Sequence, residues 1–127
     1  MSFIYYNPNP ANKSVGDCVI RALSLIMNDS WSNIYADLTM QGAFLFDMPN
    51  SKSVWGEYLK ANGFTYGVIK DTCPYCYTVR DFCRDHPYGT YVLATGTHVI
   101  GVIDGDYYDT ADSGSEVPIY YFKKGNK

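Results

Sequence analysis

The 127-residue sequence has no long hydrophobic run, and its apolar stretches fall far short of the roughly 18 residues that a membrane span needs. The start of the chain also lacks the features of a secretory signal. Its first basic residue is Lys13, and prolines occupy positions 8 and 10, where an apolar stretch would be required. We therefore expect a cytoplasmic protein without a membrane partner.

Basic residues are few and do not cluster. The chain has 10 Lys and Arg against 13 Asp and Glu, which gives a net charge of −3. Without a basic patch to neutralise phosphates, we expect no nucleic-acid partner. Four cysteines in a chain of this length do not form a secreted disulfide framework, so each should be reduced, metal-bound or reactive.

The order of local signals predicts a single α+β domain. A hydrophobic content of 46% and 17% aromatic residues favour a folded chain over a disordered one. Helix signals occupy about residues 14–88 and strand signals about residues 89–124, with no linker or repeat between them. We expect one domain over residues 1–127, in which a buried N-terminal helix packs on a C-terminal antiparallel sheet. The expected helices are 18–27, 30–42, 53–61 and one after Thr78, and the expected strands are 90–95, 98–103, 107–110 and 117–122.

Cys18 is the first candidate for chemistry. It follows Gly16-Asp17 and falls in the first turn of a helix that is apolar almost all round. The unpaired N–H groups and the dipole at that end of a helix stabilise a thiolate and lower the pKa of a cysteine. A nucleophile also needs a base, and His98 is placed at the start of a strand, where a preceding Gly-Thr pair can expose it.

The register of the expected hairpin adds a carboxylate to this pair. Asp104-Gly105 is a strong signal for a two-residue turn, which would pair Val102 with Tyr107. With that register, Asp109 is the diagonal neighbour of His98 on one face of the sheet, within reach of its side chain. A three-residue loop would instead place Asp109 on the opposite face of the sheet from His98. The pattern thus predicts a Cys-His-Asp relay, in which thiolate, imidazole and carboxylate act as nucleophile, proton carrier and orienting group.

The segments 16–18 and 98–109 resemble the papain-like cysteine peptidases. The likeness is greatest to compact bacterial and phage members and to the domains that cleave double-glycine leader peptides. Those proteins carry Cys on a central helix, His at the start of a strand, and Asp or Asn on the next strand. The resemblance implies a papain-like fold with Cys18 as nucleophile, His98 as base and Asp109 as orienting residue.

The resemblance also implies an amide side chain for the oxyanion hole. In that family a Gln stands five or six residues before the Cys, whereas this sequence has Asn12 six residues before Cys18. We expect Asn12 to serve together with the backbone N–H of Cys18, with Asn7 and Asn9 as further candidates.

The remaining cysteines allow two other interpretations. Cys73-Pro74-Tyr75-Cys76 is the sequence of a glutaredoxin active site, but the helices before it and the strands after it do not fit a thioredoxin-like order. Cys73, Cys76, Cys83 and His86 have the chemistry of a tetrahedral zinc set, although the six-residue spacer is short. Reduced structural thiols are the simpler hypothesis, and we expect no metal and no cofactor.

These observations predict a cysteine hydrolase, a peptidase or isopeptidase whose partner is a peptide or protein substrate. One alternative is a catalytically inactive module that keeps the papain-like cleft and binds a peptide in it. The second alternative is a dithiol oxidoreductase that uses Cys73 and Cys76.

Overall fold

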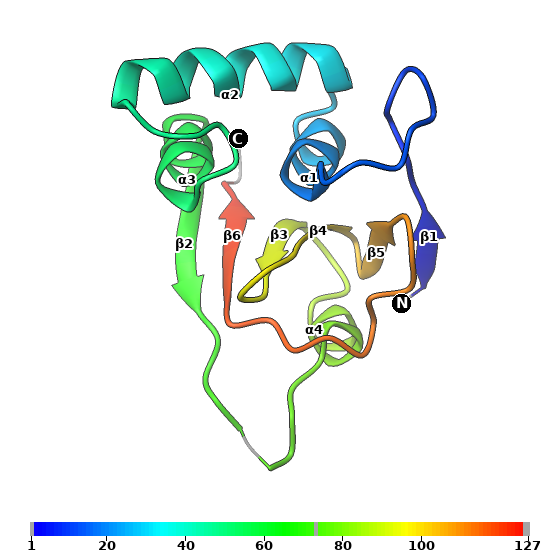
Figure 1. Ribbon diagram of the computed structural model, residues 1–127. Helices are drawn as coiled ribbons and strands as arrows, with labels where there is room; N and C mark the ends of the chain where they lie inside the picture. The colour runs from blue at the N-terminus through cyan, green and yellow to red at the C-terminus, as the bar shows by residue number, and fades with distance from the viewer. Residues whose placement is uncertain (1, 73, 126–127) are drawn as a thin grey trace.

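The computed structural model describes residues 2–72 and 74–125. Over these residues the chain forms an α+β fold of four helices and a six-stranded mixed sheet (Figure 1). The helices are α1 (Cys18–Ile26), α2 (Trp31–Leu45), α3 (Lys52–Ala61) and α4 (Val79–Asp85). The strands are β1 (Phe3–Tyr5), β2 (Phe64–Val68), β3 (Thr90–Ala94), β4 (Val99–Ile103), β5 (Asp106–Asp109) and β6 (Tyr120–Lys124).

The sheet has the order β1-β5-β4-β3-β6-β2, and it is not the purely antiparallel C-terminal sheet that the sequence predicts. β1 pairs with β5 in parallel, while the other neighbouring strands are antiparallel. Two strands, β1 and β2, lie before residue 89, so the expected division into a helical and a strand part is also wrong. β1 has only three residues, too few to show a strand pattern in the sequence.

The last strand also differs from its prediction. It spans Tyr120–Lys124, later than the expected 117–122, and it lies inside the sheet between β3 and β2. Because Pro118 precedes the strand, its missing N–H removes no hydrogen bond from the ladder. The segment before β6 is held by Ile119, whose N–H donates to the carbonyl of Ala94 at 2.8 Å.

The sheet separates two hydrophobic cores. Helices α1, α2 and α3 cover one face and α4 covers the other, as Figure 1 shows. Side chains of β3 alternate between the cores, since Val92 and Ala94 join the core of the three helices and Tyr91 and Leu93 join the core of α4. The predicted packing of N-terminal helices on the sheet is therefore confirmed.

A glycine allows α1 to approach the centre of the sheet closely. A Cβ atom at Gly101 of β4 would lie 2.8 Å from Cδ2 of Leu25 and 3.5 Å from the carbonyl oxygen of Ala22. The contact with Leu25 is too short, so a side chain at position 101 would require Leu25 to move, and the glycine leaves room for Leu25 against β4. This packing brings the beginning of α1 to the beginning of β4.

The hairpin between β4 and β5 forms as predicted. Asp104 and Gly105 both have positive φ angles, 49° and 79°, as a primed two-residue turn requires. Val102 pairs with Tyr107 and Ile103 with Asp106, so the predicted register is confirmed.

Candidate active site

Cys18 is the first residue of α1 and lies at the wall of a cleft. Its thiol is half-buried and free of any disulfide. The cleft has a volume of about 210 Å³ and also contains His98, which comes from the other half of the chain. The residues lining it come from four separate segments: Gly16, Cys18 and Val19; Asn50, Lys52 and Trp55; Thr95–Val99; and Tyr120.

His98 stands just before β4, in a turn that fixes its backbone. Its N–H donates to Oγ1 of Thr95 at 2.9 Å, and its carbonyl accepts from the N–H of Thr95 at 2.8 Å. The ring nitrogen Nε2 lies 2.6 Å from Oδ2 of Asp109, the last residue of β5. The imidazole also forms a hydrogen bond with the thiol of Cys18. Since Asp109 occupies Nε2, the remaining nitrogen Nδ1 is the one available to Cys18.

The electrostatics of these three groups favour a thiolate and an imidazolium. Burial raises the pKa of Cys18, but the hydrogen bonds from His98 and from the backbone at Val99, with the positive charges of His98 and Arg21, bring that pKa below its ordinary value. The hydrogen bond to Asp109 and then that to Cys18 raise the pKa of His98 to about 10, against the effect of burial. Between these two pKa values the sulfur carries a negative charge and the ring a positive one.

Asp109 is almost fully buried and remains ionised. Burial raises the pKa of its carboxyl, but the hydrogen bond with His98, the charge of His98 and the N–H of Thr110 lower that pKa below its usual value. The N–H of Thr110 donates to Oδ1 of Asp109 at 2.7 Å. The carboxylate is thus fixed on both oxygens.

A second cation, Arg21 of α1, holds Asp109 from the side opposite His98. Its Nη2 donates to Oδ1 of Asp109 at 3.1 Å, and its Nη1 is paired with Oδ1 of Asp17. Asp17 in turn accepts from Nε1 of Trp31 at 2.8 Å through its other oxygen. Arg21, Asp17 and Asp109 are all buried, so this chain of contacts joins the first turn of α1 to the end of β5.

Asp17 therefore does not cap α1 in the usual way. It occupies the N-cap position, but its side chain makes no hydrogen bond to the backbone N–H groups of the first turn. Its carboxylate pairs with Arg21 and Trp31 instead, which leaves those N–H groups without a side-chain cap. The sequence analysis missed this arrangement; the available signal was a lone arginine in a helix that is otherwise apolar on every side.

Asn12 is not brought to the cleft. It is exposed in the loop between β1 and α1, with a left-handed φ of 54°, and the residues that line the cleft do not include it, within the described ranges. Its Oδ1 accepts from Nδ2 of Asn7 at 3.4 Å, and Oδ1 of Asn9 accepts from the N–H of Ala11 at 2.9 Å. The three asparagines thus shape their own loop. The amide side chain that does line the cleft is Asn50, which no motif in the sequence indicates.

Cys76 and Cys83 do not line this cleft. Cys73 falls outside the described residues, so the two alternatives that use it, the Cys73–Cys76 dithiol and the zinc set, are not tested. Cys83 is buried in the core of α4, and burial raises the pKa of its thiol to about 11. The ring of His86 stacks on Phe82 at 3.9 Å between centroids, and its Nδ1 lies 2.8 Å from the carbonyl oxygen of that residue. In the part of the chain that the structure describes, no three potential metal ligands gather.

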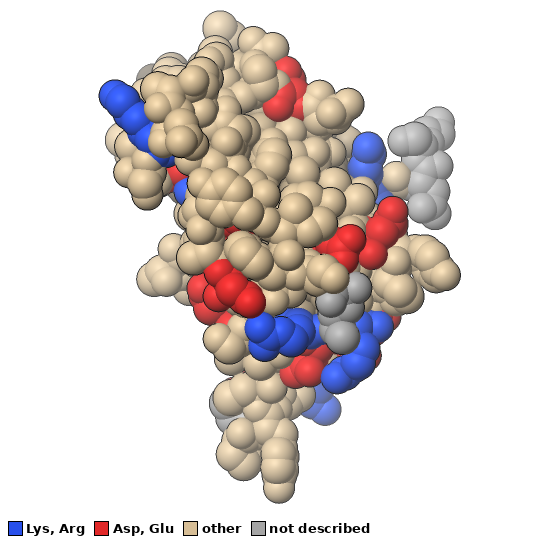
Figure 2. All heavy atoms as spheres, turned by 90° about the vertical axis from the view of Figure 1, so that its right-hand side faces the viewer, with Lys and Arg blue, Asp and Glu red and all other residues tan. Residues whose placement is uncertain are grey.

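Charges of both signs are mixed on the surface. On the face along β1, basic and acidic side chains lie next to one another over the lower half, and neither sign forms a continuous patch there (Figure 2). Helix α4 contributes exposed pairs of this kind, with Arg84 placed 3.1 Å from Asp81 and 3.4 Å from Asp85. This face offers no basic track for a nucleic-acid backbone.

Comparisons of the chain with protein-family models, with curated proteins and with solved structures found no match. Within residues 2–72 and 74–125, no helix has the length and hydropathy that crossing a membrane would require.

Proposed function

We propose that this chain is a papain-like cysteine hydrolase, a peptidase or isopeptidase that acts on a peptide-type carbonyl. The observation that carries the proposal is the contact of Cys18, His98 and Asp109, three side chains from separate elements that meet beside an open cleft. A buried structural cysteine has no need of a hydrogen-bonded imidazole, whereas a nucleophile does.

The first half of the reaction is acylation of Cys18. The thiolate attacks the carbonyl carbon of the substrate, and the new S–C bond pushes an electron pair onto the carbonyl oxygen. The backbone N–H of Cys18, at a helix start without a side-chain cap, is a donor for that oxyanion. As the tetrahedral intermediate collapses, the C–N bond breaks and the imidazolium of His98 gives its proton to the leaving amine.

The second half is hydrolysis of the thioester. The imidazole of His98, now neutral, takes a proton from water as the water oxygen attacks the acyl carbon. Collapse of this intermediate releases the acid and returns the sulfur to the thiolate form, with His98 protonated. Asp109 keeps its hydrogen bond to Nε2 throughout, which orients the ring and stabilises its charged form.

The arrangement of elements supports the papain-like part of the proposal. Cys18 begins a buried helix, His98 stands at the start of a strand, and Asp109 ends the next strand along the chain. This is the order in which the papain-like peptidases carry their three residues.

Thiol alkylation tests the proposal directly. Native protein is treated with iodoacetamide at pH 6, and the rate at each cysteine is followed by peptide mass spectrometry. A thiolate reacts with iodoacetamide and a neutral thiol does not, so Cys18 should react at least about 10-fold faster than the exposed Cys76. This allows for the lower intrinsic nucleophilicity of a thiolate with a lowered pKa. Cys83, whose pKa is raised to about 11, should be the slowest of the three.

Catalysis is tested with an activated ester such as p-nitrophenyl acetate. We expect a burst of about one nitrophenolate per chain, followed by slower turnover, with both lost in Cys18→Ser and both kept in the matched control Cys76→Ser. A reactive Cys18 that forms an acyl-enzyme without turnover would favour the inactive peptide-binding module. Equal alkylation of Cys18 and Cys76 would refute the proposal.

A further inference from the structure

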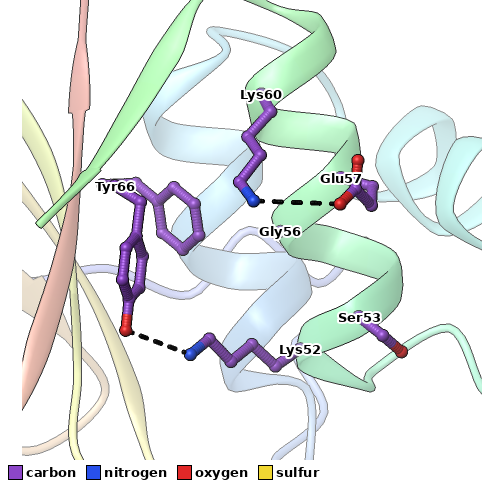
Figure 3. Close-up of a pocket in the computed structure, with 7 residues that line it drawn as sticks. Lys52, Ser53, Gly56, Glu57, Lys60 and Tyr66 are labelled. Carbon is purple, nitrogen blue, oxygen red and sulfur yellow. Dashed lines mark hydrogen bonds and ion pairs between the residues drawn. The ribbon is translucent and has the colours of Figure 1, made fainter.

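Lys52, the first residue of α3, stands where the cleft of Cys18 meets a second hollow. It lines the cleft and also a neighbouring groove of about 370 Å³ between α3 and strands β2 and β6 (Figure 3). Since one side chain forms part of both walls, a substrate held at Cys18 and extending into the groove would pass Lys52. The residues that line the groove are Lys52, Ser53, Gly56, Glu57, Lys60, Tyr66 and Phe122.

Aromatic rings and a hydroxyl hold the ammonium group of Lys52 in place. Its Nζ lies 4.0 Å from the ring centroid of Tyr120 and 4.7 Å from that of Tyr66, and it donates to the Tyr66 hydroxyl at 3.3 Å. In Figure 3 the side chain reaches from α3 towards the tip of Tyr66. Tyr120 lines the cleft of Cys18, so the charge is fixed at the border of the two hollows.

This positive charge lacks an acidic partner among the described residues. No Asp or Glu oxygen in that part of the chain lies within ion-pair distance of Lys52 Nζ. The one carboxylate that lines the groove, Glu57, faces Lys60 at 3.8 Å. Lys60 is therefore partly neutralised, while the charge of Lys52 is available to a ligand.

We propose that Lys52 binds a carboxylate of the substrate, so that the substrate class is a peptide with a negative charge close to the bond that Cys18 attacks. This inference rests on the proposed function, because it assigns Cys18 as the reacting atom. Two sources supply the same chemistry, an Asp or Glu side chain within the peptide and a free C-terminal carboxylate. A carboxylate gains both the charge and the hydrogen-bond donors of the ammonium group.

Matched alkylating peptides test the inference at Cys18. The first pair is iodoacetyl-Glu-NH₂ and iodoacetyl-Gln-NH₂, which differ in a side-chain carboxylate. The second pair is iodoacetyl-Gly-OH and iodoacetyl-Gly-NH₂, which differ in a terminal carboxylate. In each case the Cys18 sulfur displaces iodide and forms a thioether, and the ratio of the acidic to the neutral rate measures the preference for the carboxylate.

We expect Lys52→Met to lower this ratio about 3- to 5-fold in at least one pair, as suits a single charge contact open to solvent. The imidazolium of His98 attracts anions in every variant, so the comparison between variants isolates Lys52. Lys70→Met removes the same charge from an exposed site outside both hollows and should keep the native ratio. Lys52→Arg keeps the positive charge and should keep most of the native preference for the acidic reagent.

The pair that responds identifies the source of the carboxylate. An unchanged ratio in Lys52→Met for both pairs overturns the inference while the proposed function stands, provided that the neutral reagents still select Cys18. If no reagent selects Cys18 over Cys76, the proposed function fails and the inference fails with it.

Discussion

Arg21 is the residue whose loss should do most damage to the site without touching a reacting atom. Its guanidinium contacts two buried carboxylates, those of Asp17 and Asp109. With Arg21→Met the stem of the side chain is largely preserved, but both carboxylates lose their shared partner. Among the side chains that the structure describes, Asp109 keeps its hydrogen bond with His98, whereas Asp17 keeps only the one from the indole N–H of Trp31.

The expected cost follows from the geometry of the pair. At the separation of 3.1 Å between Nη2 and Oδ1 of Asp109, the attraction is about 5 kcal/mol for an effective dielectric constant of about 20. Removing one partner of a buried ion pair costs about 3–5 kcal/mol, because the remaining charge is left uncompensated. We therefore expect Arg21→Met to lower the free energy of unfolding by about 3–5 kcal/mol, measured by urea titration at pH 7.

Arg84→Met is the matched control. Arg84 forms a pair with Asp81 that is also one turn apart on a helix, but the side chains are 58% and 31% exposed, so the loss should stay below about 1 kcal/mol. Adding Asp17→Asn to Arg21→Met removes one uncompensated charge and should restore about half of the lost stability. Arg21→Met should also raise the pKa of Cys18, because the charge of Arg21 lowers that pKa in the native protein. The pH profile of Cys18 alkylation measures this shift.

Two results would refute the reasoning. One is a cost of Arg21→Met no larger than that of Arg84→Met. The other is a further loss of stability when Asp17→Asn is added, since an Asn at this position has no charge left to compensate.

Two further predictions concern the imidazole and the position of α1. Asp109→Asn removes the largest cause of the raised pKa of His98, so that pKa should fall from about 10 towards 6.5, as measured by NMR titration, and the pH profile of Cys18 alkylation should move upwards. In the native protein, protonated His98 stabilises the fold fully below pH 6.5, and this stabilisation is lost as the pH rises through about 10. In Asp109→Asn the loss should occur at a lower pH. An unchanged titration of His98 would contradict this prediction. Gly101→Ala places a Cβ 2.8 Å from Leu25 and should cost about 1–3 kcal/mol in thermal or urea unfolding, whereas Gly96→Ala, with open space around its Cβ, should change stability by less than about 0.5 kcal/mol. Equal stability of the two alanine variants would show that α1 does not depend on this close contact.

The sequence predicts the local features of the site well. The turn at Asp104-Gly105 needs two residues that accept positive φ, and Asp-Gly is a pair that does so, which fixes the hairpin register. The start of α4 at Thr78 is equally local, because its capping box uses only the side chains and backbone of the first turn. Cys18 at the start of α1 follows from the apolar pattern of the residues after it.

The sequence could not supply the contacts between distant elements. β1 is too short for a pattern, and its parallel pairing with β5 joins two ends of the chain that no local signal connects. The alternation of side chains along the strands also gives the wrong direction at the site. Ile100 and Tyr107 face the core of α4, and residues two positions apart in a strand point to the same side of the sheet. Strict alternation would therefore direct His98 and Asp109 away from α1. His98 precedes its strand and Asp109 ends its own, and there the side chains meet α1 at the end of the sheet.

Local chemistry thus determined which residues could act: a thiol at a helix start, an imidazole before a strand, and a carboxylate one hairpin away. Tertiary packing decided that they meet, because α1 packs against β3, β4 and β5 and this brings the thiol to the imidazole. It also decided their surroundings. The pairing of Arg21 with Asp17 and Asp109, and the placement of Lys52 beside the cleft, depend on side chains from separate segments, whose distances in space no spacing along the chain encodes.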